Sequence, residues 1–353
     1  MKIAIIGDTH CGIRNSSEIF LDNAEKFYQD VFFPYCKEHG IKQILHLGDY
    51  YDHRKYVNFK ALYRNRKHFL EPLRDNKMTM DIILGNHDVY HKNTNEINSL
   101  KELLGHFMNE VNLVLEPRVM EYGSLKIGLL PWINRENYDE SMSFVKNCKA
   151  DMLAAHLELN GFNLMKGVKN THGMDHKLFS RFEKVLSGHF HTKSEKDNVV
   201  YLGSQMEFFW SDAHDPKYFH VLDTETREIE AVLNPHTLFE KIVYDDSNKD
   251  YSDYEVDHLD KKFVKVVVVN KNEPFTFDRL IDRIQNQDIY ELKIAETFSE
   301  FVGENVEDEG ISVEDTPTLL DSYIDVVDTE LDKERIKISM KKLLAEAQTL
   351  EVV

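Results

Sequence analysis

Five short polar motifs in the first 191 residues hold the side chains best suited to chemistry. They are Gly7-Asp8-Thr9-His10, Gly48-Asp49-Tyr50-Tyr51-Asp52, Gly85-Asn86-His87-Asp88, Ala155-His156 and Gly188-His189-Phe190-His191. Each follows an apolar run, so each is predicted at the carboxyl end of a strand, where ligands bind in open α/β sheets. A single Gly-Asp is usually a turn, and a single histidine is usually a surface or hydrogen-bonded residue. Five such motifs at successive strand ends indicate one shared site.

The residue types in these motifs favour divalent metal ions. In Asp8-x-His10 and His189-x-His191, a spacing of two places both side chains on one side of an extended backbone. Carboxylate, amide and imidazole donors without a thiolate suit Mn²⁺, with Mg²⁺, Fe²⁺ or Zn²⁺ as competitors. Seven such ligands exceed the needs of one ion and suit a pair about 3.5–4 Å apart, which clamps phosphate oxygens and activates water.

The elements that must position these motifs alternate between strands and helices. Strands are predicted at 2–8, 41–49, 80–88, 125–130, 150–155, 184–187, 199–202 and 217–223, and helices at 18–39, 58–75 and near 95–104. This alternation predicts a layered α/β domain whose helices cover the sheet. Because the later strands follow one another without helices, we expect a second sheet packed on the first.

The pattern changes near residue 240. Segments 263–270, 275–287 and 289–296 predict a small β-α-β unit, and 319–327 and 334–350 predict two short amphipathic helices. Between Lys293 and Lys333 there are thirteen acids and no Lys or Arg, which predicts a flexible linker. The predicted domains are 1–239, a capping domain at 240–300, an acidic linker at 301–317 and a helical tail at 318–353.

Composition excludes several classes of protein. No run of about 18 apolar residues exists, so no membrane-spanning segment is expected, and the N-terminal apolar stretch is too short for a signal peptide. We therefore expect a cytoplasmic protein. Three cysteines without a CxxC predict neither a disulfide framework nor a structural zinc site.

Acidic residues are concentrated in the last third of the chain. The formal net charge is −19. Residues 241–353 hold 14 Lys/Arg against 28 Asp/Glu, whereas residues 1–240 hold 29 against 34, and also 16 of the 17 histidines. Chemistry is therefore expected in the first two-thirds, and a different role is expected for the acidic end.

The order of the motifs resembles a known signature. D-x-H, GDxxD, GNHD, a single His and GHxH, in this order, are typical of calcineurin-like metallophosphoesterases. Within that superfamily the chain is similar to the SbcD-type nucleases, relatives of the meiotic-recombination nuclease. The likeness is greatest to tailed-phage recombination endonuclease subunits, through AHLELNGF (155–162), SGHFHTKSE (187–195), YLGS (201–204) and DPKYFHVLDTET (215–226). The resemblance is strong over about residues 1–235. Over the remainder of the chain, only the layout of segments is similar.

The resemblance implies a fold and a ligand set. The fold is an α/β sandwich of two sheets flanked by helices, with a small α+β capping domain and a C-terminal helical tail. The cofactors are two Mn²⁺ ions, or Mg²⁺. One would be bound by Asp8, His10, Asp49 and His191, and the other by Asp49, Asn86, His156 and His189. His87 would lie beside the scissile phosphate, oriented by Asp88. Some relatives carry a histidine where this chain has Asp52, which leaves the roles of Asp52 and His53 open.

The resemblance also implies an activity and partners. The activity is a Mn²⁺-dependent DNA nuclease, a double-strand exonuclease and single-strand endonuclease, in an SbcCD-type recombination and repair complex. Its partner would be an SbcC-type, SMC-like ATPase, bound by an apolar stripe of Ile336, Met340, Leu343 and Leu344. The alternative is that this stripe packs on its own domain. A homodimer would form through helices near 58–70 and 91–105. If the chain is phage-encoded, it would act in the host cytoplasm.

A basic stretch follows the second motif. No acid occurs between Asp52 and Glu71, and the predicted DNA contacts are His53, Arg54, Lys55, Lys60 and Arg64. These residues could meet the DNA backbone beside the metal site. The alternative is an ordinary solvated helix face.

Two other functions remain open. A phosphatase or small-substrate phosphodiesterase of the same superfamily would use the same metals, although the capping unit and tail suit a nuclease better. A non-catalytic scaffold would have lost metal ligands, whereas all seven are present here.

Overall fold

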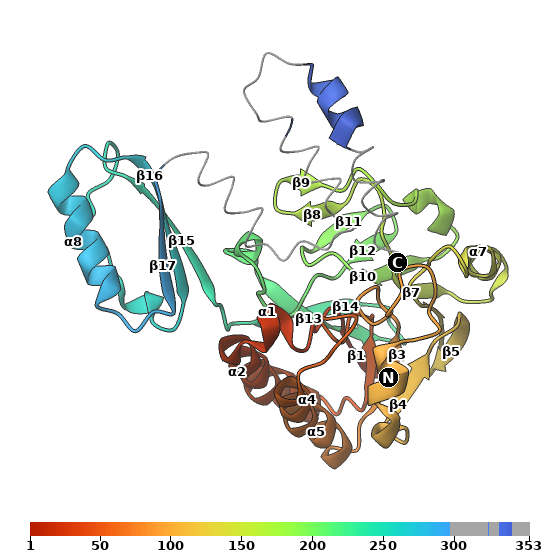
Figure 1. Ribbon diagram of the computed structural model, residues 1–353. Helices are drawn as coiled ribbons and strands as arrows, with labels where there is room; N and C mark the ends of the chain where they lie inside the picture. The colour runs from red at the N-terminus through yellow and green to blue at the C-terminus, as the bar shows by residue number, and fades with distance from the viewer. Residues whose placement is uncertain (297–323, 325–331, 341–353) are drawn as a thin grey trace.

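Two six-stranded sheets packed face to face form the larger part of the molecule (Figure 1). The computed structural model describes residues 1–296, 324 and 332–340. The first sheet has the order β14 (Ile229–Asn234), β13 (Lys217–Asp223), β1 (Lys2–Ile6), β2 (Gln43–His46), β3 (Thr79–Ile83), β4 (Val111–Val114). The second has the order β11 (Ser194–Lys196), β12 (Val199–Tyr201), β10 (Lys184–Gly188), β7 (Met152–His156), β6 (Leu125–Leu130), β5 (Arg118–Tyr122).

The central strands of each sheet are parallel. β1, β2, β3 and β4 run in one direction, and so do β12, β10, β7 and β6. In β1, Ile3 and Ile5 pack between the sheets while Ala4 and Ile6 pack under the helices. Burial on both faces explains the unbroken apolar runs that end in the polar motifs.

Helices cover the outer face of the first sheet. One continuous helix comprises α2 (Glu18–Lys26), a π turn (Phe27–Phe32) and α3 (Phe33–Glu38). A second comprises α4 (Phe59–Asn65), a π turn (Arg66–Leu70) and α5 (Glu71–Asp75). Both agree with the helices predicted at 18–39 and 58–75. α6 (Ser99–Leu103) follows β3, and α1 (Ile13–Ser16) is a short turn with left-handed residues.

The second sheet is covered mainly by α7 (Tyr138–Asn147) and by connecting segments. Short elements here are a hairpin of β8 (Asn163–Met165) and β9 (Val168–Lys169), with 3₁₀ turns at Gly105–Phe107, His176–Phe179, Trp210–Asp212 and Asp257–Leu259. The sequence patterns did not predict α7, β4, β5 or β14. Of these, β5 and β14 are antiparallel edge strands with largely exposed or half-buried faces, so they lack an apolar run.

A small lobe follows the two sheets. It is a parallel sheet of β15 (Phe239–Asp245), β16 (Phe263–Asn270) and β17 (Glu291–Ala295), with α8 (Pro274–Gln285) on the side away from the larger sheets (Figure 1). The predicted β-α-β unit is thus present with one further strand, β15. Aromatic contacts join this lobe to the sandwich. The ring centroids of Phe20 and Phe263 are 5.8 Å apart, and those of Trp210 and Phe239 are 4.9 Å apart.

The predicted fold class, a calcineurin-like sandwich with a small α+β lobe, is confirmed by this architecture. The predicted linker and most of the predicted tail lie outside the described residues, except for a helix at 333–340. No helix in the described part of the chain combines the length and apolar character that a bilayer crossing requires. All three cysteines are free thiols.

Candidate metal centre

The five polar motifs come together where the parallel strands end. β1, β2 and β3 lead into residues 8–10, 48–52 and 85–88, and β7 and β10 lead into His156 and 188–191. Because parallel strands of one sheet end at a common edge, and the two sheets pack together, residues up to 183 positions apart in sequence become neighbours. The seven predicted ligands all lie in this one region.

The strands are shorter than predicted, and this changes how the ligands are presented. Asp8, His10, Asp49 and His189 all have positive φ values, of 49°, 41°, 53° and 94°. An extended backbone therefore does not place Asp8 and His10 on one side, as their spacing suggested. Left-handed conformations of non-glycine residues are strained and cluster at functional sites.

Hydrogen bonds between neighbouring loops hold these conformations. The Asp8 N–H donates to Gly48 O at 2.9 Å and the His10 N–H donates to Asp49 O at 3.1 Å. The approach is close enough that a Cβ on Gly85 would lie 2.1 Å from Asp49 Oδ1. Glycine at position 85 is therefore required by the position of the Asp49 carboxylate.

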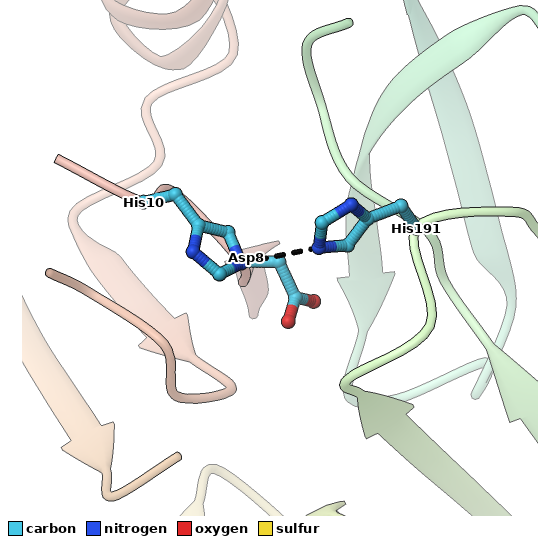
Figure 2. A group of neighbouring side chains, drawn as sticks. All are labelled: Asp8, His10 and His191. Atoms are coloured by element: carbon cyan, nitrogen blue, oxygen red, sulfur yellow. Dashed lines mark hydrogen bonds between the residues drawn. The ribbon is translucent and has the colours of Figure 1, made fainter. Parts of the chain in front are cut away.

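Asp8, His10 and His191 form a first group of donor atoms. Their ligand atoms lie within 4.8 Å of one another. Figure 2 shows the His10 and His191 rings pointing toward each other, with the Asp8 carboxylate beside them; the two Nε2 atoms are 3.1 Å apart. Two imidazole nitrogens at this distance face a common point, as ligands of one ion do.

Asp49, His156 and His189 form a second group within the same limit of 4.8 Å. Asn86 joins it, since its Oδ1 lies 2.8 Å from His156 Nε2 and 2.9 Å from His189 Nδ1. Asp49 lies between the groups, with Oδ2 3.3 Å from His156 Nε2 and 3.8 Å from His10 Nε2. Its position suits a carboxylate shared by two ions.

The chemistry of the donors fits a bound cation. His156 Nδ1 lies 2.7 Å from the Leu47 carbonyl oxygen and so carries a hydrogen. Its Nε2 then faces the oxygens of Asn86 and Asp49, which are both acceptors, so a proton or a metal ion must lie between them. Asp8 Oδ2 and His189 Nε2 are also buried without a hydrogen-bond partner in the described structure. Such orphaned acceptors are rare unless an ion satisfies them.

Burial and close charges shift the pKa values of this centre in opposite directions. Burial lowers the pKa of His10 and His156, but Asp52 and Asp49 beside His10, and Asp49 beside His156, raise both to about 9. Burial also keeps the pKa of His189 and His191 well below the usual range. Burial raises the pKa of Asp49, yet the neighbouring histidines hold it well below its usual value.

His87 lies beside both groups and forms a third group of donor atoms with His10 and Asp49, within the same limit of 4.8 Å. Its N–H donates to Asp49 Oδ1 at 2.8 Å, and its ring lies 4.8 Å from the His10 ring. Its Nδ1 lies 2.5 Å from the Asp52 carbonyl oxygen. A half-buried imidazole oriented in this way is available to a substrate at the metal centre.

Asp88 has different contacts from those predicted. Its carboxylate accepts hydrogen bonds from the N–H groups of Tyr50, Tyr51 and Gly85 at 2.9–3.2 Å. Among the described contacts, the Asp52 carbonyl therefore orients the His87 ring, whereas Asp88 ties the second motif loop to the third. The role of Asp52, which sequence left open, has a geometric answer too: its Oδ1 lies 3.2 Å from His10 Nδ1.

A buried ion cluster behind the centre was missed by sequence reasoning. Lys217 is almost fully buried, and its Nζ donates to Asp212 at 2.7 Å, to Asp215 at 2.9 Å and to the His191 carbonyl at 2.9 Å. Lys217 thereby fixes the backbone of a predicted ligand. In the sequence, the one indication is a lysine at the first position of an apolar strand. A lysine side chain is usually expected to be exposed to solvent, so its burial was not predicted.

The basic stretch is partly engaged within the protein. The Arg64 guanidinium binds Asp22 and Glu25 of α2, and Lys60 pairs with Glu18. Their charges are thus largely compensated. His53 and Lys55 are exposed beside the centre, and the His53 ring stacks on Tyr56 at 3.6 Å.

Of the predicted partner-binding residues, the structure describes two. Ile336 and Met340 are half-buried on the helix at 333–340. Leu343 and Leu344 lie outside the described residues.

This fold and this donor set define a class of enzyme. The family model of the calcineurin-like phosphoesterases matches residues 1–193, more than half of the chain and all five motifs, so the chain belongs to that family. Membership implies divalent metal binding, in agreement with the two donor groups. The predicted enzyme class, a metal-dependent phosphoesterase, is thereby confirmed.

A particular relative is similar along nearly its whole length. Exonuclease subunit 1 of Enterobacteria phage T4 is 30% identical over 355 residues, which covers 98% of this chain and 99% of the relative. The predicted likeness to a tailed-phage nuclease subunit is confirmed by this match. Among solved structures, a novel archaeal phosphodiesterase aligns over 66% of this chain and 100% of its own, at 17% identity and a TM-score of 0.36.

Proposed function

We propose that the chain is a DNA nuclease that hydrolyses phosphodiesters with two Mn²⁺ ions. The observation that carries the proposal is the pair of adjoining donor groups with the Asp49 carboxylate between them. Full-length similarity to an exonuclease subunit supports DNA as the substrate. Oxygen and imidazole donors favour Mn²⁺, and Mg²⁺ is the alternative.

The residues divide into those that hold metal and those that act on the substrate. Asp8, His10, Asp49 and His191 would hold one ion, and Asp49, Asn86, His156 and His189 the other. When bound, the ions neutralise the phosphate charge and lower the pKa of an attacking water. His87 donates Nδ1–H to the Asp52 carbonyl, and Nε2 meets the scissile phosphate. In its imidazolium form the ring also carries a proton on Nε2, which it gives to the leaving oxygen as it becomes neutral. Asp88 holds the loops in register.

The same proposal includes partners. An SbcC-type ATPase would bind the apolar stripe of Ile336, Met340, Leu343 and Leu344, and its ATP cycle would regulate exonuclease and endonuclease action. A homodimer would use the segments near 58–70 and 91–105, where Phe59 is 87% exposed and Ile97 48% exposed. Exposed apolar side chains of this size suit an interface. DNA would pass His53, Arg54 and Lys55.

Digestion of DNA tests the proposal directly. End-labelled duplex and single-stranded DNA would be incubated with Mn²⁺ or Mg²⁺, with and without the ATPase, beside an Asp49→Asn control. We expect Mn²⁺-dependent cleavage by the unaltered protein and none by the control. If p-nitrophenyl phosphate were hydrolysed and all DNA remained intact, the phosphatase alternative would replace this proposal. Absence of bound metal would favour the scaffold.

A further inference from the structure

A cavity adjoins the metal centre on the side of the second sheet. It has a volume of about 490 Å³, and its wall includes the metal-ligand candidate His156. Its other walls come from the loop after β6, the start of α7 and the chain near Gly173. Pockets that bind small ligands have volumes of about 300–1,000 Å³. The cavity is thus large enough for a substrate group beyond the phosphate.

One wall of the cavity is held rigidly against the metal loops. Trp132 packs on His156 and His189, with ring centroids 5.9 and 5.4 Å apart. Its carbonyl accepts hydrogen bonds from Asn95 Nδ2 at 3.1 Å and from Asn137 Nδ2 at 3.0 Å. Its own N–H donates to Leu84 O at 2.8 Å, next to the third motif. This wall is therefore formed before any substrate binds.

Another part of the lining is also closely fitted. Met174 donates its N–H to Glu158 O at 3.0 Å, and a Cβ on Gly173 would lie 2.4 Å from the same oxygen. Gly173 has a φ of +87°, so both space and conformation favour glycine there.

The lining residues indicate what kind of group would enter. Trp132 and Tyr138 offer aromatic rings, and Tyr138 is 44% exposed. Arg135, Asp139 and Glu158 line the same space, so its charged residues carry both signs. A guanidinium donates hydrogen bonds to ring carbonyls and a carboxylate accepts them from amino groups, and nucleobases offer both kinds of group. An aromatic wall with donors and acceptors suits a planar base.

We propose that this cavity binds one unstacked nucleoside of the substrate, next to the scissile phosphate. The inference rests on the proposed function, because it requires a phosphodiester at the metal centre. A base inside a duplex cannot reach such a cavity without leaving its stack. The cavity therefore makes the enzyme selective for nucleotides at frayed ends or in single strands.

The test compares two diesters that differ in the nucleoside alone. Thymidine 5′-(p-nitrophenyl phosphate) and methyl p-nitrophenyl phosphate release the same leaving group, so the ratio of their kcat/KM values isolates the nucleoside. For the unaltered protein we expect a ratio well above one. Tyr138→Ala should lower the ratio roughly 5- to 150-fold, the usual range for loss of one base-stacking ring. Tyr138→Phe should keep it.

Two controls separate this effect from damage to the protein. The methyl ester should be hydrolysed equally by all variants, which verifies the metal centre. Tyr90→Ala removes a tyrosine of similar exposure, 39%, outside the cavity lining, and should leave the ratio unchanged. A ratio near one in the unaltered protein, or an unchanged ratio in Tyr138→Ala, would overturn the inference.

DNA digestion remains a separate arm of the experiment. A protein that prefers the thymidine ester through Tyr138 but leaves DNA uncut would support the cavity and contradict the proposed nuclease. Cleavage of DNA without any nucleoside preference among the esters would contradict the cavity and leave the nuclease standing.

Discussion

At the scale of single residues, the centre is defined by ring nitrogens and oxygens that are all hydrogen-bond acceptors and that face one another. His156 presents Nε2 to two oxygens, and His10 and His191 present ring nitrogens to each other at 3.1 Å. Without a cation between them, such contacts require extra protons or repel each other. The arrangement is therefore one that metal binding stabilises, and three predictions follow from individual side chains.

Asp49 is the residue whose loss should affect both ions. Asp49→Ala removes the carboxylate between the two groups and the acceptor of the His87 N–H. We expect loss of more than about 99% of Mn²⁺-dependent cleavage, since both metal sites lose a ligand. Cleavage assays and metal analysis check this, with the exposed Asp75→Ala as control. Retention of more than a few per cent of activity would reject the shared-ligand assignment.

His87 should affect rate without affecting metal content. His87→Asn removes the group proposed to protonate the leaving oxygen, and we expect a decrease of roughly 10²–10⁴-fold in kcat. Metal analysis should still find two ions per chain. A variant that binds fewer than two would show that His87 is itself a ligand.

Metal binding should release protons. The pKa values of His10 and His156 are raised to about 9, so both rings are protonated at pH 7.5 in the metal-free protein. The stabilisation from these protons is complete below a pH of about 6.5 and is lost as pH rises toward 9. Metal affinity should therefore rise from pH 6 to 9, with about two protons released at pH 7.5.

Calorimetry in two buffers of different ionisation enthalpy measures that release. His156→Asn should release about one proton fewer than the unaltered protein. Binding enthalpies that do not depend on the buffer would contradict the protonated state of these rings.

At the scale of elements, the predicted ligands are held by loops that are joined to one another by hydrogen bonds. Asp88 joins the second motif to the third, and Lys217 joins the start of β13 to the fifth motif. Strained residues at the ends of β1, β2 and β10 persist because these bonds fix them.

Lys217 provides the test at this scale. Lys217→Met leaves Asp212 and Asp215 without their buried cation, which should lower the free energy of unfolding by about 3–5 kcal/mol. It also frees the His191 carbonyl, so Mn²⁺ affinity should fall. Lys184→Met in β10 is the control, because its 3.9 Å pair with Glu195 is solvent-exposed and worth about 0–1 kcal/mol. Urea unfolding should separate the two variants, and equal midpoints would contradict the role assigned to Lys217.

At the scale of the whole molecule, the catalytic sandwich is joined to a lobe with its own core. The Glu207 carboxylate accepts the N–H groups of Leu238 and Phe239 where the chain enters β15, and burial raises its pKa to about 7. Aromatic contacts of Phe20 and Trp210 complete the junction. Segments beyond this lobe are proposed to recruit the ATPase.

The apolar stripe near the end of the chain should be needed for recruitment alone. Replacing Ile336, Leu343 and Leu344 with Asp removes burial worth about 1.5–3 kcal/mol per large side chain. We expect the variant to retain metal and intrinsic cleavage but to separate from the ATPase in gel filtration. Glu334→Lys, also on this helix, is the control for a change of charge. Undiminished co-elution of the triple variant would place the ATPase contact elsewhere.

The sequence by itself determined which residues come together at the strand ends. Asp8, Asp49, Asn86, His156 and their companions are marked by residue type and by the apolar strands before them, which are local features. Parallel strands inevitably bring such ends to one edge, so the fold class and the metal chemistry could be predicted together.

The tertiary structure alone decided how those residues are supported. That Asp52 rather than Asp88 orients His87, that Lys217 is buried behind His191, and that Tyr138 lines a cavity beside His156 all depend on contacts between distant segments. Local pattern carries no information about such contacts, because the partner of a buried polar group is set by the packing of whole sheets. Ligand identity is local in the chain, whereas ligand geometry is a property of the fold.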